Sequence, residues 1–166
     1  MRLPTSPASR PLRGVERTLF LPLVVRAQAP ASFPLLDPQD RCAQEVLRLS
    51  GEPADAYPSD GATTLNILWR TQKIKDIGRH FFEHFPHVQG VNLGAGLSDY
   101  FQWLDNGQNR WLDIDLPDVV ALRQQLMPHT DARRETRIGD LRTAGWWNRL
   151  GLQRHNHRNP LLLISE

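Results

Sequence analysis

The sequence is poor in features that define several classes of protein. One cysteine, Cys42, stands among 166 residues, so an internal disulfide is excluded and a reducing compartment such as the cytoplasm is expected. No apolar run approaches the roughly 20 residues of a membrane-spanning helix, so a membrane partner is not indicated. Neither charge dominates, because 20 basic and 18 acidic side chains give a net charge of +2. A nucleic-acid partner is therefore not indicated either.

The N-terminal segment contains an arrangement that imitates a secretion signal. Residues 1–14 show no periodicity and are predicted to be a disordered lead-in. Arginines then precede the apolar run 19–25, and the small residues of 27–29 follow it, in the order of a signal peptide. Pro22 interrupts the run, however, and Arg26 stands just before the supposed cleavage site. We therefore favour an amphipathic helix that packs on the domain.

Residues 15–86 are predicted to form an N-terminal helical region. Helices are expected at 15–29 and 40–49, and three prolines between them indicate an irregular connector over 30–38. A long helix should follow, with Ser59 or Asp60 as its cap.

The long helix ends before Pro86 and has one cation beside its apolar face. Arg70 stands three residues after the apolar Ile67, and a buried charge needs a partner. Arg70 is therefore expected to have a partner of opposite charge or a hydrogen-bond acceptor. The predicted apolar stripe consists of Ile67, Ile74, Ile77, Phe81 and Phe85.

From residue 87 the hydrophobic pattern alternates between strands and helices. This alternation predicts an α/β fold with the parallel sheet of a doubly wound domain. The chain stops directly after its most apolar strand, which should lie centrally in the sheet. Residues 87–166 are therefore expected to be the first half of a Rossmann-like domain. The predicted strands are 88–93, 110–114, 136–138 and 160–165, and the predicted helices are 97–104, 117–127 and 144–150.

Polar or glycine residues follow each predicted strand. Because parallel strands end at one edge of a sheet, these residues should line one crevice, where ligands of such sheets bind. A glycine turn lets a ligand approach the backbone, and an acid after the second strand is typical of a ribose site. The absence of a third glycine argues against a pyrophosphate. These two acids also have explanations that involve no ligand: Asp115 could cap the helix that follows, and Asp113 could simply be solvated. The residues are Gly94 and Gly96, Asp113 and Asp115, Asp140 and Leu141, and Glu166.

Three short segments resemble those of one enzyme family. Residues 92–97 (NLGAGL), 104–107 (LDNG) and 113–117 (DIDLP) closely resemble the leucine carboxyl methyltransferase family. The similarity is greatest to its bacterial branch, which resembles tetracenomycin-type polyketide O-methyltransferases. It covers about residues 15–166. After the turn the family often reads Gly-Leu-Asp-Thr-Arg, whereas this chain has Gly-Leu-Ser-Asp-Tyr over 96–100, so the acid and the arginine are displaced or lost.

The resemblance implies a class I methyltransferase that uses S-adenosyl-L-methionine to methylate a carboxyl or hydroxyl group of a small-molecule, polyketide-like acceptor. Nothing in the sequence names that acceptor or an oligomeric state. In the family's pattern Arg70 matches the residue that holds the methionine carboxylate, and Asp115 matches the ribose-binding acid. Gly94 and Gly96 match the family's glycine turn, which lies against the ligand, and Asp140 and Leu141 match the pair of residues beside the adenine. Glu166 matches the acid that follows the fourth strand, near the ligand. Arg17 matches a basic residue of the family's leading helix.

Three other functions remain open at this stage. A strand, a glycine turn and an acid also fit an NAD-binding oxidoreductase fragment. His80, Glu83 and His84 match the H-x-x-E-H pattern of a zinc hydrolase, although the polar face of a helix explains the same residues. A chain that lacks the second half of its domain could also be a non-catalytic truncated remnant.

Overall fold

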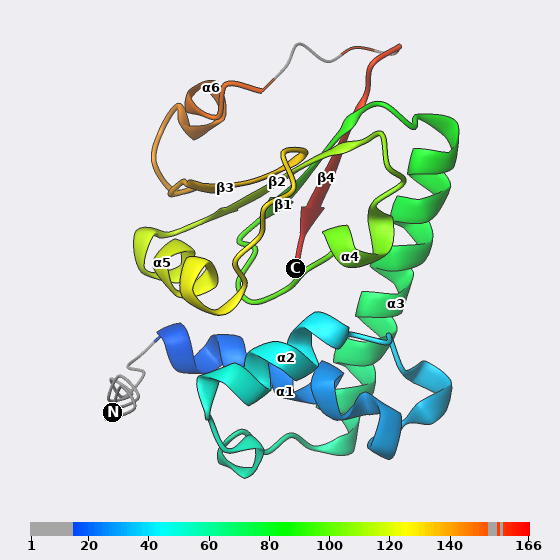
Figure 1. Ribbon diagram of the computed structural model, residues 1–166, viewed down its shortest axis with the longest axis vertical. Helices are drawn as coiled ribbons and strands as arrows, with labels where there is room; N and C mark the ends of the chain where they lie inside the picture. The colour runs from blue at the N-terminus through cyan, green and yellow to red at the C-terminus, as the bar shows by residue number, and fades with distance from the viewer. Residues whose placement is uncertain (1–14, 153–155, 157) are drawn as a thin grey trace, which may run out of the picture.

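A computed structural model describes residues 15–152, 156 and 158–166, with side chains from residue 18 onward (Figure 1). The lead-in predicted over 1–14 and the side chain of Arg17 lie outside the described residues. The predicted α/β class is confirmed by a parallel sheet with helices around it. The strands are β1 (Gln89–Leu93), β2 (Arg110–Asp115), β3 (Arg134–Ile138) and β4 (Leu161–Ser165). The helices are α1 (Val15–Ser32), α2 (Arg41–Ser50), α3 (Gly61–His84), α4 (Phe101–Leu104), α5 (Pro117–Leu126) and α6 (Trp146–Arg149), with the short 3-10 helices η1 (Pro34–Leu36) and η2 (Ala54–Ala56).

The strand order places the ends of β2, β1 and β4 side by side at the carboxyl edge of the sheet. The order is β3-β2-β1-β4, so the chain moves outward from β1 to β3 and then returns to the other side of β1. Leu93 at the end of β1 is in register with both Ile114 of β2 and Ser165 of β4. In Figure 1, β4 points toward the layer that α1 and α2 form below the sheet. The reversal point, where ligands of open parallel sheets bind, therefore faces this helical layer.

Helix α1 forms as predicted but continues through two prolines. It contains Pro22 and Pro30 and ends at Ser32, although a connector was predicted from Pro30 onward. A proline inside a helix costs about 3 kcal/mol. Phe20 and Leu23 are fully buried, and each such side chain contributes about 1.5–3 kcal/mol, so packing outweighs the local preference. In the part of the chain that is described, neither α1 nor any other helix is long and apolar enough to cross a membrane.

Helix α3 is capped as predicted, but its buried face is rotated from the predicted stripe. The Asp60 carboxylate accepts a hydrogen bond from the Thr63 amide at 2.7 Å. Ile77 was predicted to be buried and is 63% exposed. A Cβ on Gly78 would lie 2.7 Å from the side chain of Leu104, so the absence of a side chain there lets α4 approach. Packing against α1, α4 and β4, rather than apolar spacing alone, sets the buried face. Its buried residues are Ile67, Leu68, Thr71, Lys75, Gly78 and Phe82.

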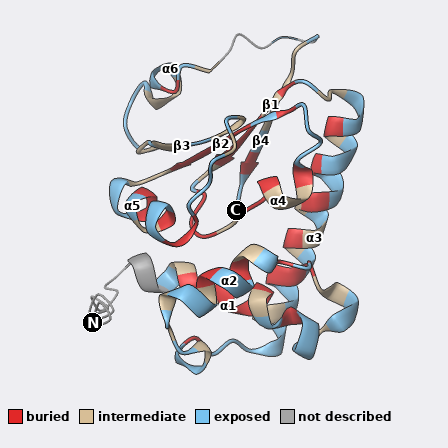
Figure 2. Ribbon diagram, viewed as in Figure 1, coloured by how far each residue is buried: buried red, intermediate tan, exposed pale blue. Residues whose placement is uncertain are grey.

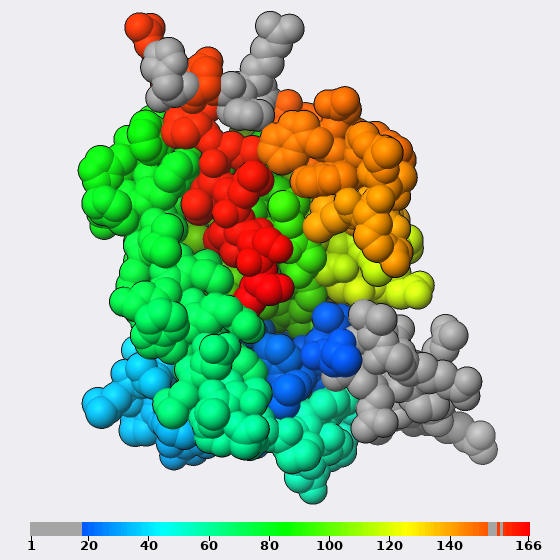
Figure 3. Space-filling view, turned by 180° about the vertical axis from the view of Figure 1, so that it is seen from behind, coloured from blue at the N-terminus to red at the C-terminus, as the bar shows by residue number. Residues whose placement is uncertain are grey.

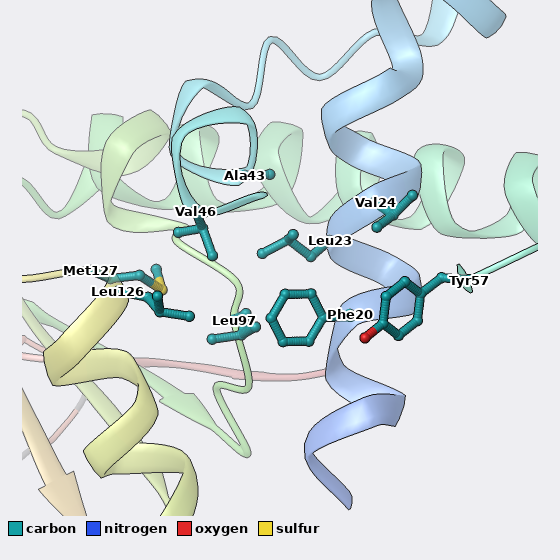
Figure 4. Close-up of a cluster of buried hydrophobic side chains, with 9 residues drawn as sticks. All are labelled: Phe20, Leu23, Val24, Ala43, Val46, Tyr57, Leu97, Leu126 and Met127. Carbon is teal, nitrogen blue, oxygen red and sulfur yellow. The ribbon is translucent and has the colours of Figure 1, made fainter. Parts of the chain in front are cut away.

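The helical layer and the sheet edge share one hydrophobic cluster. Figure 2 shows buried residues concentrated in β1, β2 and the inner faces of the helices. Figure 4 shows Leu97, from the loop after β1, pointing into the cluster between side chains of α1, α2 and the end of α5. The loop after β1 is thus anchored in the core of the helical layer. The cluster consists of Phe20, Leu23, Val24, Ala43, Val46, Tyr57, Leu97, Leu126 and Met127.

Strand β4 was predicted to lie centrally and to be covered on both faces. In the described residues it is instead an edge strand that pairs with β1 alone. Leu163 is 47% exposed, and Figure 3 shows β4 at the surface between α3 and α6. Packing therefore accounts for Ile164, which is buried, but not for the exposed Leu163.

Candidate functional site

The chain turns sharply at the carboxyl end of β1. Gly94 and Gly96 have φ values of +67° and +50°, in the left-handed region that favours glycine. The amides of Gly94 and Ala95 donate to the carbonyl oxygen of Ile114 at 2.9 and 3.0 Å, which ties the turn to β2. A Cβ on Gly94 would meet no atom within 4 Å. The backbone of Gly94 is therefore open to a ligand.

Asp115 ends β2 beside this turn and is half-buried. Its Oδ2 atom accepts a hydrogen bond from the Gly96 amide, and its Oδ1 atom accepts one from the Leu116 amide, both at 2.7 Å. The expectation that Asp115 caps α5 is wrong, because Leu116 occupies the cap position and no side chain caps that helix. The two bonds fix the carboxylate, and each oxygen retains a second lone pair for a ligand donor.

A shallow hollow of about 180 Å³ lies beside the turn and Asp115. Asp140 after β3 accepts hydrogen bonds from Nε and Nη2 of Arg142, both at 2.9 Å. These bonds lower the pKa of Asp140 to about 2, so it is a carboxylate at neutral pH. The hollow therefore combines two leucine side chains with two carboxylates, which accept hydrogen bonds from hydroxyl and amino groups. Its lining residues are Gly94, Asp115, Leu116, Gly139, Asp140, Leu141 and Arg142.

A second group of candidate residues meets at the end of β4. Arg70 on α3 was predicted to need a partner, and its Nε and Nη2 atoms each lie 2.8 Å from Oε1 of Glu166. The Tyr100 hydroxyl donates to Oε2 of Glu166 at 2.5 Å. Tyr100 is 1% exposed, and this burial raises its pKa, so the hydroxyl remains a donor at neutral pH. Arg70 is 40% exposed and can still contact a ligand from its solvent side.

Asp113 has a structural position that the sequence did not reveal. It is fully buried, which excludes both a solvated carboxylate and one that faces a ligand. Its Oδ1 atom accepts hydrogen bonds from Asn92 at 3.2 Å and from the Trp111 indole at 3.1 Å. Its Oδ2 atom pairs with Arg123 at 2.7 Å and with Arg134 at 3.1 Å. Of the two strand-end acids, only Asp115 is placed to receive a ligand.

The loop that departs from the family's usual residues is held by arginines from elsewhere in the chain. Asp99 is buried and pairs with Arg134 of β3 at 3.0 Å. Arg123 of α5 and Arg26 of α1 donate to backbone carbonyls of the same loop. Sequence reasoning missed these arginines, although the signal that identified Arg70, a cation beside the apolar residues of a helix, is present for Arg26 and Arg123.

The zinc-like motif lies on the exposed side of α3. The Nδ1 atom of His84 lies 2.9 Å from the carbonyl oxygen of His80, so this ring faces its own helix. His80 and Glu83 are 75% and 71% exposed and 3.7 Å apart. Among the described residues, no group of three or more His, Cys, Asp or Glu side chains is placed to hold a metal ion. The geometry of this motif gives zinc chemistry no support.

Comparison with known proteins agrees with the family suggested by the short motifs. A family model described as leucine carboxyl methyltransferase matches residues 23–166. The tetracenomycin polyketide synthesis O-methyltransferase of Streptomyces glaucescens is 28% identical over 157 residues, which are 93% of this chain and 55% of that protein. The chain thus spans about half the length of this relative. The matched range includes every candidate residue from Arg70 to Glu166.

Proposed function

Because the chain belongs to the leucine carboxyl methyltransferase family, we propose that its strand-end residues bind S-adenosyl-L-methionine and that the complete protein is an O-methyltransferase. The observation that carries the proposal is the hollow between Gly94, Asp115 and Asp140, which lies after β1, β2 and β3 at the carboxyl edge of the sheet, next to the reversal of strand order at β1. Glu166 follows β4, on the other side of β1, at the same edge, and it pairs there with Arg70 of α3. Open parallel sheets bind their ligands at this position.

The residues of the hollow fit an adenosine. A Cβ on Gly94 would stand in open space, so the absence of a side chain leaves room for the ligand. Asp115 is fixed by two amides and has free lone pairs for the two ribose hydroxyls. Asp140 can accept a hydrogen bond from the adenine amino group, while Leu141 offers an apolar contact to the ring.

The same turn is a poor fit for a dinucleotide. A pyrophosphate is usually held by the N-terminus of a helix that begins directly after the glycine turn. Here the side chain of Leu97 is buried in the core of the helical layer, and the next helix begins only at Phe101 and has four residues. This geometry favours a ligand without a pyrophosphate over NAD.

The methionine part of the ligand would lie against the second group of residues. The Arg70 guanidinium is suited to a planar carboxylate because it presents paired N–H donors. Glu166 supplies a negative charge beside it, which suits the methionine ammonium. Tyr100 and Arg70 fix the Glu166 carboxylate from two sides, so its orientation is set before a ligand binds.

When bound, S-adenosyl-L-methionine supplies a methyl group that its sulfonium makes electrophilic. The residues of the chain bind and orient the reactants for in-line transfer. A carboxylate acceptor needs no base, whereas a phenol must lose its proton. Tyr100 does not provide that base, because burial raises its pKa and its proton is shared with Glu166. The relative named for polyketide synthesis favours a polyketide-like acceptor with a carboxyl or hydroxyl group.

Calorimetric titration of the full-length protein tests the cofactor. S-Adenosyl-L-methionine and its demethylated product should bind, and NAD⁺ should not. Binding of NAD⁺ with no binding of S-adenosyl-L-methionine would reverse the assignment.

Transfer of a labelled methyl group tests the acceptor class. Aromatic polyketide acids and phenols serve as acceptors, and the products are then treated with alkali. A methyl ester releases labelled methanol under alkali and a methyl ether does not, so the test separates the two acceptor groups. Cofactor binding without transfer to any acceptor tried would favour the non-catalytic remnant.

A further inference from the structure

Two buried arginines, one from α5 and one from α1, hold the backbone of the loop after β1. The Nη1 atom of Arg123 on α5 lies 2.7 Å from the carbonyl oxygen of Gly96, 2.9 Å from that of Ser98 and 3.5 Å from that of Ala95. The Nη2 atom of Arg26 on α1 donates to the carbonyl oxygen of Leu97 at 3.2 Å. The consecutive carbonyls of Gly96, Leu97 and Ser98 thus each accept a hydrogen bond from an arginine side chain.

Each of these arginines is buried together with a carboxylate. Arg123 pairs with Asp113 at 2.7 Å, and the two side chains are 2% and 0% exposed. Arg26 pairs with Asp40 at 2.8 Å, and these are 2% and 1% exposed. Buried ion pairs contribute little net stability, because desolvation offsets their attraction. Two such pairs against one loop therefore point to a role beyond stability.

The peptide group between Ala95 and Gly96 links this arrangement to the ligand site. Its N–H, which belongs to Gly96, donates to Asp115 at 2.7 Å, while its carbonyl oxygen accepts from the Ser98 amide at 3.0 Å and lies 3.5 Å from Nη1 of Arg123. The next carbonyl, that of Gly96, accepts the shortest of the Arg123 bonds. The arginine thus fixes the peptide planes that orient the Asp115 carboxylate. The side chain of Leu97, buried in the helical layer, holds the loop at a further point (Figure 4).

We propose that Arg123 and Arg26 are positioning residues that hold the loop Gly94–Ser98 in its ligand-binding conformation before the ligand arrives. The inference rests on the proposed binding of S-adenosyl-L-methionine and assigns a role to two residues that do not contact it. Glycines at positive φ leave such a loop free to sample other conformations. A loop that is already fixed loses less conformational entropy on binding, so the ligand binds more tightly.

The variant Arg123→Lys in the full-length protein tests this inference. Lysine keeps a positive charge, but its single nitrogen cannot contact both Asp113 and the loop carbonyls, which Arg123 reaches with Nη2 and Nη1 respectively. We expect the Kd for S-adenosyl-L-methionine to rise at least about tenfold at a temperature where the variant is fully folded, since preorganisation contributes directly to affinity. Amide hydrogen exchange over residues 95–98 should accelerate, while exchange in α3 should not change.

Leu68→Ala is the control for a purely structural effect. Leu68 is fully buried in a separate hydrophobic cluster of α1 and α3, so its truncation should lower the Tm. It should leave both the Kd and the loop exchange unchanged. If Arg123→Lys does not fold, Arg26→Lys replaces it in both measurements, because Arg26 contacts a single loop carbonyl and lysine can keep the pair with Asp40.

The two readouts separate this inference from the proposed function. Failure of the wild-type protein to bind S-adenosyl-L-methionine would refute the proposed function, while loop exchange would still test whether the arginines order the loop. Wild-type affinity and unchanged loop exchange in a folded arginine variant would overturn the inference. Accelerated exchange with unchanged affinity would also overturn it, because the ordered loop would then be irrelevant to binding.

Discussion

Replacement of Asp115 by alanine removes a side chain that serves both the fold and the proposed ligand site. In the chain as described, the carboxylate accepts hydrogen bonds from the amides of Gly96 and Leu116, each at 2.7 Å. A buried donor left unpaired costs about 1–3 kcal/mol. Because Asp115 is only half-buried, water can replace part of both bonds. We therefore expect Asp115→Ala to lower the free energy of unfolding by about 1–2 kcal/mol, which leaves the protein folded.

The expected effect on ligand binding is larger than the effect on the fold. Two ribose hydroxyls would donate charge-assisted hydrogen bonds to the carboxylate, each worth about 1.5–3 kcal/mol. The loss of one such bond already corresponds to about a tenfold change in Kd. Asp115→Ala should thus weaken binding of S-adenosyl-L-methionine at least about tenfold. Asp115→Asn should lose less, because its amide keeps one acceptor and adds a donor that the ribose oxygen can accept.

Calorimetry on the full-length variants measures this loss, and circular dichroism melts confirm that each variant is folded at the titration temperature. Asp118→Ala is the matched control, because Asp118 is an exposed aspartate in the first turn of α5 and lines no part of the hollow. An unchanged Kd in folded Asp115→Ala would refute the ribose assignment. Asp113 could not have taken over, because both of its oxygens are occupied by buried partners.

Four further predictions address other parts of the chain. Arg70→Lys should weaken binding of S-adenosyl-L-methionine much more than binding of adenosine, because adenosine lacks the carboxylate that Arg70 would hold. If calorimetry finds the same loss of affinity for both ligands, Arg70 has a structural role instead. Burial raises the pKa of Cys42 to about 12 from 9.0, so its thiol should react slowly with iodoacetamide near neutral pH in the native protein and quickly in urea. Because the pKa of Cys42 is higher in the folded protein, its thiol loses the proton at lower pH in the unfolded chain than in the folded one, and the free energy of unfolding should fall as the pH rises above 9.0. Cys42→Ala should reduce that fall, as measured by urea melts at increasing pH. The polypeptide 1–166 expressed alone should self-associate through the exposed edge of β4, as measured by light scattering. Leu163→Lys should reduce this association, because Leu163 is an exposed apolar residue of that strand. A monomeric wild-type polypeptide would contradict the prediction.

Strands β1, β2 and β4 could be predicted because each contains a short apolar run bounded by turn residues. Strand β3 has one apolar residue, Ile138, and it begins at Arg134, two residues before the predicted strand. The polar residues at the strand ends could then be placed at one edge, since parallel strands share their direction. Helix boundaries were less predictable. Pro30 indicates a break in any local reading, but α1 continues because it packs against α2 and α3. The orientation of α3 likewise depends on Leu104 meeting Gly78, a contact that apolar spacing does not encode.

The candidate site was predictable to the extent that its residues follow strands. The contact between Arg70 and Glu166 is consistent with the expectation that a cation beside an apolar stripe has a partner. The burial of Asp113 was not predictable, because it depends on arginines that arrive from α5 and β3. A single sequence shows that a helix carries an arginine among apolar residues, but it does not show which carboxylate that helix will meet.

The strand order also has a consequence for synthesis on the ribosome. The central strand β1 has one neighbour, β2, that follows soon after it, while its other neighbour, β4, is at residues 161–165. Until those residues leave the ribosome, one row of backbone donors and acceptors of β1 has no strand to pair with. Such an open row can pair with other nascent chains. Slowing translation between β3 and β4 should therefore prolong the interval in which chaperones bind this chain, whereas slowing it after β4 has emerged should not affect the exposure of β1.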